Sequence, residues 1–220
     1  MRILLIHTAG GEGSVALADT GLMQPIVATE VLPGRTSSEL LVPIVRQLLE
    51  VRGWNLNALG AVVVVHGPGS FTGVRVGLSA AKGFSEAAGV PLVAVSRLAL
   101  LATAAVGEGE PIHAVLDAGR GEFYYGKYLG RRRLQESLMS RKELLTAVGG
   151  GVVVACEAKV AETLELALQI VAEPSAGDAL PFVLERIEAN DFDDVATLDA
   201  NYLRRSDAEI FAKPAVRAVP

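Results

Sequence analysis

The feature that most constrains the fold is an apolar strand followed at once by a glycine-rich turn and a helix. Ala61–Val65 is apolar at every position and mostly β-branched, which is typical of a strand covered on both faces. Gly67, Gly69 and Gly73 follow, with Pro68 between the first two, and a helix is predicted to run on to about residue 88. This order of elements indicates an α/β protein.

Other short apolar segments repeat this alternation of strands and helices. In the first half, we expect strands at 2–6, 13–18, 26–31, 61–65 and 92–95, and helices at 38–51, 74–88 and 97–106. In the second half, we expect strands at 112–116, 122–128 and 152–155, and helices at 141–147, 157–171 and 177–189. Gly107–Pro111 is the best candidate for a boundary, so the prediction is an N-terminal lobe, 1–106, and a C-terminal lobe, 107–220, whose last segment is able to pack on the first lobe.

Two helices have faces suited to packing. The helix expected at 38–51 has a broad apolar face, and Thr36 and Glu39 have the spacing of a capping box, with Ser38 as a rival N-cap. The helix after the turn carries small residues on one face, which lets another element approach closely. These are Gly73, Gly77, Ala80 and Ala81. The stripe either packs on the chain's own sheet or forms a subunit interface.

Composition bounds the class of protein. Of the 220 residues, 50% are hydrophobic and 20% are charged, which favours a folded core over disorder. No apolar window is long enough for a membrane span, and the apolar run of Met1–Ile6 is too short for a signal peptide. Cys156 is the single cysteine, so an internal disulfide is excluded, which fits the cytoplasm. The net charge of −5 argues against direct binding of nucleic acid by the surface of this chain. The only basic run, Arg131–Arg133, is either a solvated loop or a contact to RNA or an acidic partner.

Nucleotide-binding motifs fit the turn poorly. No P-loop pattern is present, and the spacing of Gly67, Gly69 and Gly73 is one residue longer than the dinucleotide fingerprint. Arg97 follows the strand expected at 92–95, where an arginine is able to meet a 2′-phosphate, so NADP binding stays an alternative. Pro68 stands where a nucleophile elbow needs its first glycine. A tight structural turn is the simplest interpretation.

The chain offers no persuasive catalytic constellation. His7, His66 and His113 are the only histidines, and neither their spacing nor the single cysteine predicts a metal site. Asp117 and Glu122 could form a carboxylate pair across strands, or a hydrogen-bonded site where the lobes meet. Three serines lack a paired base in the sequence: Ser70, Ser79 and Ser96.

The segment Gly67–Leu78, with Ala81–Gly83 behind it, resembles the signature of the bacterial TsaB family, also called YeaZ. Three further stretches are similar to that family. They are the opening strand Ile3–Ile6, the segment Asp117–Tyr124, and Asn201–Arg205 with Ala208, Glu209, Lys213 and Pro214 near the end. His7 departs from the family pattern, which has aspartate there, and so does Gly119, where the family often has arginine.

The resemblance implies a two-lobed actin/Hsp70/sugar-kinase-like (ribonuclease H-like) α/β fold with mixed sheets and flanking helices. It implies a non-catalytic scaffolding subunit for the TsaD-like transferase that places a threonylcarbamoyl group on N6 of adenosine 37 in tRNA. A TsaE-like ATPase is the further partner, a homodimer forms when the partner is absent, and tRNA is met only indirectly. No cofactor is expected on the isolated chain, any ATP being held mainly by the catalytic partner, and no membrane contact is implied. A small phosphotransferase and a peptidase are the alternatives.

The resemblance also assigns residues. The helices 38–51 and 74–88 are implied to dock the partner, with no metal site and no catalytic residue on this chain. The implied interface residues are Leu41, Val45, Leu48, Gly73, Gly77, Leu78, Ala80 and Ala81. The residues of the turn, structural or facing a ligand, are Gly67, Pro68, Gly69, Ser70, Phe71, Thr72 and Arg75.

Overall fold

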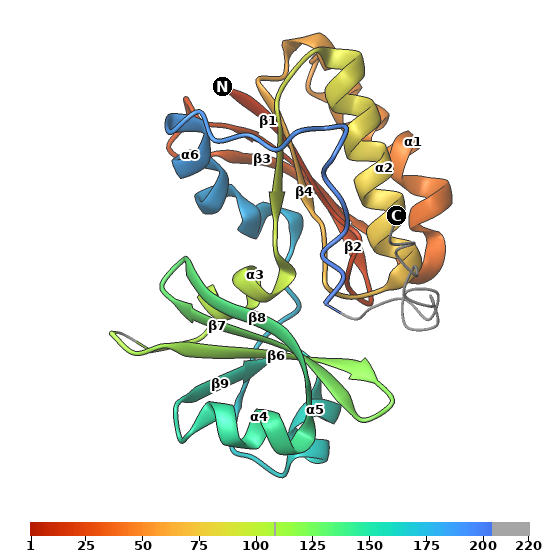
Figure 1. The fold of residues 1–220 in the computed structure, drawn as a ribbon. Helices are drawn as coiled ribbons and strands as arrows, with labels where there is room; N and C mark the ends of the chain where they lie inside the picture. Colours follow the sequence, from red (N-terminus) through yellow and green to blue (C-terminus); the bar gives the residue numbers. More distant parts are fainter. Residues whose placement is uncertain (108, 204–220) are drawn as a thin grey trace, which may run out of the picture.

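Two five-stranded mixed sheets, each with its own helices, make up the computed structural model (Figure 1). The structure describes residues 1–107 and 109–203, so the resemblance at Arg204, Arg205, Ala208, Glu209, Lys213 and Pro214 lies outside the described residues. Within them, no helix combines the length and the apolar character that crossing a bilayer would take.

The first sheet has the strand order β3-β2-β1-β4-β5. Its strands are β1 (Arg2–His7), β2 (Gly13–Asp19), β3 (Ile26–Leu32), β4 (Ala61–Val65) and β5 (Leu92–Val95). Strand β1 pairs antiparallel with β2 and parallel with β4, which places the apolar strand β4 in the interior of the sheet, as its composition predicts. Helices α1 (Ser37–Val51) and α2 (Phe71–Ala88) lie together on one face (Figure 1).

The second sheet has the order β10-β9-β6-β7-β8. Its strands are β6 (Ile112–Gly119), β7 (Glu122–Leu129), β8 (Arg132–Ser140), β9 (Val152–Ala155) and β10 (Gln169–Ile170). Helix α3 (Arg97–Thr103) packs on the face toward the first sheet, whereas α4 (Arg141–Val148) and α5 (Ala158–Leu164) cover the other face (Figure 1). Helix α3 therefore lies at the junction of the two sheets.

After the second sheet the chain returns to the first. A 3-10 turn (Ala176–Ala179) and α6 (Leu180–Glu188) bury Ala176, Ala179 and Val183 in the same apolar cluster as β1 and β4. Asp193 then accepts a hydrogen bond from the backbone N–H of Ala94, next to the edge strand β5. The segment from Ala176 to Asp193 thus contacts the first sheet, and the division into lobes at 106 and 107 stays a prediction.

Several predicted elements are corrected by the structure. Strand β8 was not predicted, because it is an edge strand whose residues are mostly exposed and polar and so lack apolar alternation. The helix predicted at 157–171 ends at Leu164, where Glu165 takes the left-handed conformation, and its second half contains β10. The helix predicted at 177–189 starts as the 3-10 turn and becomes α-helical only at Leu180.

The capping prediction for the first helix is right in its position, because Thr36 is the N-cap residue of α1, but wrong in its hydrogen bond. Thr36 Oγ1 donates to the carbonyl oxygen of Pro33 at 2.6 Å and caps no helical N–H group. A complete capping box occurs instead at α4, where Ser140 accepts from the N–H of Glu143 and the Glu143 carboxylate accepts from the N–H of Ser140.

Candidate functional site

The glycine-rich turn Gly67–Gly73 is pressed against the connection between β1 and β2. A Cβ atom on Gly69 would lie 2.1 Å from the carbonyl oxygen of Ala9, and one on Gly73 would lie 2.0 Å from that of Thr8. Both distances are far below van der Waals contact with backbone atoms. Only glycine allows these two backbones to approach so closely.

Hydrogen bonds fasten the same two segments. Thr8 Oγ1 donates to the carbonyl oxygen of Gly73 at 2.6 Å, and the N–H of Ser70 donates to the carbonyl oxygen of Ala9 at 2.8 Å. Ser70 is also the N-cap of α2, because its Oγ accepts from the N–H of Gly73. The turn therefore positions α2 on β1, and this geometry favours the interpretation as a structural turn.

The small-residue stripe of α2 continues this contact. A Cβ atom on Gly77 would lie 2.2 Å from Thr8 Oγ1, and Ala81 is fully buried against the sheet. The residues predicted at a partner interface that are buried within the chain are Leu41, Val45, Gly73, Gly77, Leu78 and Ala81. In the isolated chain these side chains face the interior of the protein, and their place at a partner interface stays a prediction. Leu48 and Ala80 are partly exposed.

The outer side of the turn carries an aromatic patch. The Arg75 guanidinium carbon lies 3.3 Å from the ring centroid of Phe71 and 5.1 Å from that of Tyr202. Phe71 is 65% exposed and Tyr202 is 44% exposed, so this cation–π arrangement faces solvent. Of the turn residues predicted to face a ligand, Ser70 and Thr72 are exposed as well, whereas Gly67 and Pro68 are buried.

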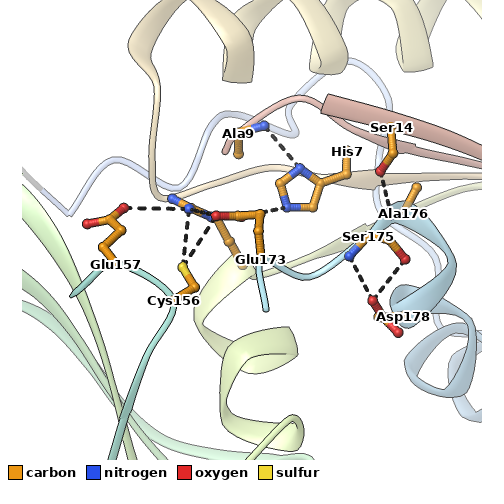
Figure 2. Close-up of polar contacts among 10 residues, drawn as sticks. His7, Ala9, Ser14, Cys156, Glu157, Glu173, Ser175, Ala176 and Asp178 are labelled. Atoms are coloured by element: carbon orange, nitrogen blue, oxygen red, sulfur yellow. Dashed lines mark hydrogen bonds and ion pairs between the residues drawn. The ribbon is translucent and has the colours of Figure 1, made fainter. Parts of the chain in front are cut away.

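A polar cluster lies behind the turn, where the two sheets meet (Figure 2). The buried guanidinium of Arg97 donates from Nε and Nη2 to the two carboxylate oxygens of Glu173, at 2.8 and 2.6 Å. Glu157 Oε1 lies farther from Nη2, at 3.7 Å, and Cys156 Sγ donates to Glu173 Oε2 at 3.3 Å. Bidentate pairing of this kind is among the stronger polar contacts in proteins.

His7 completes the cluster from the end of β1. The N–H of Ala9 donates to His7 Nδ1 at 3.3 Å, so the neutral ring carries its proton on Nε2. Nε2 is buried without a hydrogen-bond partner and lies 3.7 Å from Glu173 Oε1, toward which the ring points in Figure 2. The histidine that replaces the family's aspartate therefore presents an unused donor to a carboxylate.

Burial controls the ionisation of this cluster. It lowers the pKa of His7 to about 4, with the charge of Arg97 acting in the same direction. It raises the pKa of the Cys156 thiol to about 12 despite the opposing charge of Arg97. Burial would also raise the pKa of Glu173, but the hydrogen bonds and charge of Arg97 overcome it and hold that pKa below its usual range. At neutral pH the Arg97–Glu173 ion pair therefore lies beside a neutral imidazole and a neutral thiol.

A second buried carboxylate joins the two sheets from another direction. Glu136, on β8, accepts from Ser96 Oγ at 2.5 Å, from Asn201 Nδ2 at 2.7 Å and from the hydroxyl of Tyr128. Ser96 is the N-cap of α3. Asn201 lies in the returning segment, where its N–H donates to the carbonyl oxygen of His66, the residue that follows β4. This carboxylate therefore ties three separate parts of the chain together.

The other candidate residues from the sequence lie apart. His66 Nδ1 contacts the carbonyl oxygen of Val95, and His113 Nδ1 contacts the hydroxyl of Tyr125 inside the second sheet. Asp117 accepts from Lys159 Nζ at 2.8 Å. Across residues 1–107 and 109–203, no three His, Cys, Asp or Glu side chains gather in a way that could hold a metal ion.

The surroundings of Arg97 argue against the NADP alternative. Arg97, which that alternative needs beside a 2′-phosphate, is 3% exposed and paired with Glu173, so its guanidinium is already occupied.

Glu173 and Glu136 were not singled out in the sequence, because each is an isolated acid in a segment without a motif. No local signal reports that such a residue will be buried opposite a cation from another element.

The chain matches a family model and curated relatives in the same pathway. The matching model is described as TsaD, tRNA N6-adenosine threonylcarbamoyltransferase, and covers residues 30–178. A tRNA threonylcarbamoyladenosine biosynthesis protein TsaB from Escherichia coli is 36% identical over 58% of this chain and 55% of its own length. The TsaB of Bacillus subtilis is 32% identical over 67% of this chain and 63% of its length. The chain thus spans more than half but less than two thirds of the length of these relatives.

A solved structure supports the same relationship across nearly the whole chain. The crystal structure of an uncharacterized Pseudomonas aeruginosa protein with similarity to peptidase YEAZ superposes with a TM-score of 0.77 at 26% identity, covering 92% of this chain and 99% of that one. The two-lobed α/β fold expected from the resemblance is confirmed. With a family model matching residues 30–178 and relatives named TsaB, the chain belongs to the TsaB/YeaZ family.

Proposed function

We propose that this chain is a non-catalytic subunit that binds and supports a TsaD-like threonylcarbamoyltransferase acting on N6 of adenosine 37 in tRNA. The names of the E. coli and B. subtilis relatives place those proteins in threonylcarbamoyladenosine biosynthesis. A scaffolding role, rather than a catalytic one, agrees with the structural role of the Gly67–Gly73 turn, which packs α2 against the end of β1.

The observation that carries the proposal is the partly exposed apolar surface of the adjacent helices α1 and α2. Each helix has a stripe of partly exposed apolar side chains at helical spacing, next to the stripe that it buries on the sheet. These residues are Leu40, Ile44 and Leu48 on α1, and Val76, Ala80 and Phe84 on α2. Val51, at 77% exposure, extends the apolar stripe of α1 at the end of that helix. Exposed apolar surface on adjacent helices is typical of a docking site for another helix pair.

We propose further that two copies of this chain pair through the same surface when the catalytic partner is absent. In the complex, ATP is held mainly by the catalytic subunit, a TsaE-like ATPase is the additional partner, and tRNA is met only indirectly, in the cytoplasm. The net charge of −5 supports an indirect contact with tRNA.

Matched charge substitutions test the docking surface. Ala80→Glu puts a carboxylate into the stripe of α2, whereas Ser79→Glu puts the same group on the adjacent exposed position. Leu48→Glu and Gln47→Glu make the equivalent pair on α1. Because burying an unpaired charge at an interface costs several kcal/mol, we expect the stripe variants to weaken binding of the TsaD-like subunit at least about tenfold. The control variants should bind it normally.

Binding is measured by titration calorimetry of the purified subunits, with circular dichroism to show that each variant is folded. Equal affinity of Ala80→Glu, Leu48→Glu and the unchanged chain would exclude this surface. The nucleotide alternative is tested in the same instrument with Mg-ATP and NADP. Tight binding of either by the isolated chain, without a complex, would replace the scaffold with an enzyme.

A further inference from the structure

The cluster at the junction of the sheets has the donors of an anion site. Arg97 Nε, Arg97 Nη2 and the Cys156 thiol all donate to the carboxylate of Glu173, and they come from α3 and from the end of β9. A guanidinium fork binds a carboxylate and a phosphate with the same bidentate geometry. The chemistry that holds Glu173 is therefore suited equally to a free oxyanion.

Glu173 leaves one donor of this site unused. The N–H at His7 Nε2 is buried, has no hydrogen-bond partner and is aimed at Glu173 Oε1 from 3.7 Å, which is beyond hydrogen-bond distance. The planar carboxylate is held by Arg97 and Cys156 in a position that keeps Oε1 out of hydrogen-bond reach of His7 Nε2. A tetrahedral oxyanion such as phosphate has additional oxygens, so it is able to use the same guanidinium fork and meet His7 as well.

The position is also shaped to admit an anion from outside. Gly10 lies directly against the carboxylate, because a Cβ atom there would come within 2.6 Å of Glu173 Oε1. The Glu173 side chain is 30% exposed and borders a cleft that is also lined by Leu100, Thr103 and Asp178. Removing one side chain would therefore open the site to solvent without rearranging the sheets.

We propose that the junction of the two sheets is a binding site for a tetrahedral oxyanion that the chain keeps closed with its own Glu173. The carboxylate acts as a tethered occupant, held to Arg97 in place of a free anion. The site is independent of the docking surface on α1 and α2, so it is testable on the isolated chain.

The test is a substitution that empties the site. In Glu173→Ala, Arg97 loses its bidentate partner, so the melting temperature should fall and should then rise in a saturable way with inorganic phosphate. At the same ionic strength, chloride should not restore it. The unchanged chain should show no saturable response to phosphate. Formate, which is a planar carboxylate, should restore Glu173→Ala at concentrations at least about tenfold higher than phosphate, because it leaves His7 unmet.

Three further variants separate the site from general charge effects. Glu157→Ala removes the other carboxylate near Arg97, at 3.7 Å, but leaves Glu173 in place, so it should not gain a phosphate response. Glu173→Gln keeps the position filled, so it should not gain one either. The double variant Glu173→Ala, His7→Asn should lose the preference for phosphate over formate.

If Glu173→Ala does not fold on its own, its refolding yield is measured in phosphate and in chloride, and phosphate should restore the yield. The proposal is overturned if phosphate acts no better than chloride on Glu173→Ala in melting or refolding. It is also overturned if Glu157→Ala responds to phosphate as strongly as Glu173→Ala does. The first outcome would leave Arg97–Glu173 as a structural ion pair only.

Discussion

At the scale of single residues, His7 makes the stability of the protein depend on pH. Burial and the nearby charge of Arg97 lower its pKa to about 4, from 6.5 in the unfolded chain, against the opposing effects of Glu173, a backbone hydrogen bond and Asp178. Between these two values the unfolded chain binds a proton that the folded chain excludes, so stability falls as the pH drops from about 6.5 to about 4. The full difference corresponds to about 3 kcal/mol.

Replacing His7 by a side chain that does not titrate should remove this loss. Asn keeps an oxygen that is able to accept from the N–H of Ala9, as Nδ1 does. We expect the free energy of unfolding of His7→Asn to depend less on pH between 6.5 and 4 than that of the unchanged chain. Urea unfolding at a series of pH values measures the difference, and the carboxylates that lie away from His7 cancel between the two proteins. Parallel curves would mean that His7 titrates normally in the folded state.

Residues of the junction were predictable only in part. The glycines of the turn were visible, because glycine and proline at close spacing restrict the backbone whatever surrounds them. His7 was visible only as a departure from a family pattern. The partners Glu173 and Glu136 were not, because an ion pair across 76 residues leaves no periodicity or spacing in the sequence.

At the scale of single elements, two of the three glycines of α2 lie in opposite environments. A Cβ atom on Gly77 would lie 2.2 Å from Thr8 Oγ1, whereas one on Gly83 would have no heavy atom within 4 Å. The same substitution to alanine should therefore have opposite effects. Gly77→Ala should lower the free energy of unfolding by about 1–3 kcal/mol through overpacking. Gly83→Ala should raise it by about 0.5–1 kcal/mol through helix propensity.

Denaturant unfolding of the two variants and the unchanged chain makes this comparison. Because the residue type and the helix are the same in both variants, propensity cancels and the contact with Thr8 decides the sign. Stabilisation by Gly77→Ala would show that α2 does not pack on β1 as described.

Helix α4 gives a second comparison at this scale. Its capping box joins Ser140 and Glu143, and the N–H groups of both residues are bonded in it. Ser140→Ala should lower the free energy of unfolding by about 1 kcal/mol, because a helical N–H group loses its acceptor. Ser79→Ala, at an exposed position inside α2, should change it by only a few tenths of a kcal/mol. Equal effects in thermal unfolding would contradict the cap.

Elements with strong apolar periodicity were predictable, and polar edges were not. The interior strand β4 is recognisable in the sequence because it is apolar at every position, and helix α1 because its apolar residues recur at helical spacing. The edge strand β8 does not, since pairing with β7 is a tertiary choice that its exposed side chains need not reflect. Likewise, the small stripe of α2 predicted close packing correctly, but sequence alone could not tell the chain's own β1 from a partner.

At the scale of the whole molecule, the buried carboxylate of Glu136 should couple the two sheets. It sits on β8 of the second sheet and accepts from Ser96, at the start of α3, and from Asn201, in the returning segment beside the first sheet. Its side chain is 3% exposed, so these hydrogen bonds act where water competes little. Removing it takes the acceptor from Ser96, Asn201 and the hydroxyl of Tyr128, and each buried donor left unsatisfied typically costs about 1–3 kcal/mol.

Glu136→Ala should therefore separate the unfolding of the sheets as well as lower stability. In the unchanged chain, we expect hydrogen exchange of β1 and β4 to share one unfolding free energy with that of β6 and β7. In Glu136→Ala, β6 and β7 should exchange through an opening of lower free energy while β1 and β4 keep more protection. Glu185→Ala, which removes an exposed partner of Arg131, should leave the two sheets coupled. Exchange followed by mass spectrometry resolves the strands, and equal loss of protection in both sheets would show that Glu136 stabilises the molecule without coupling its halves.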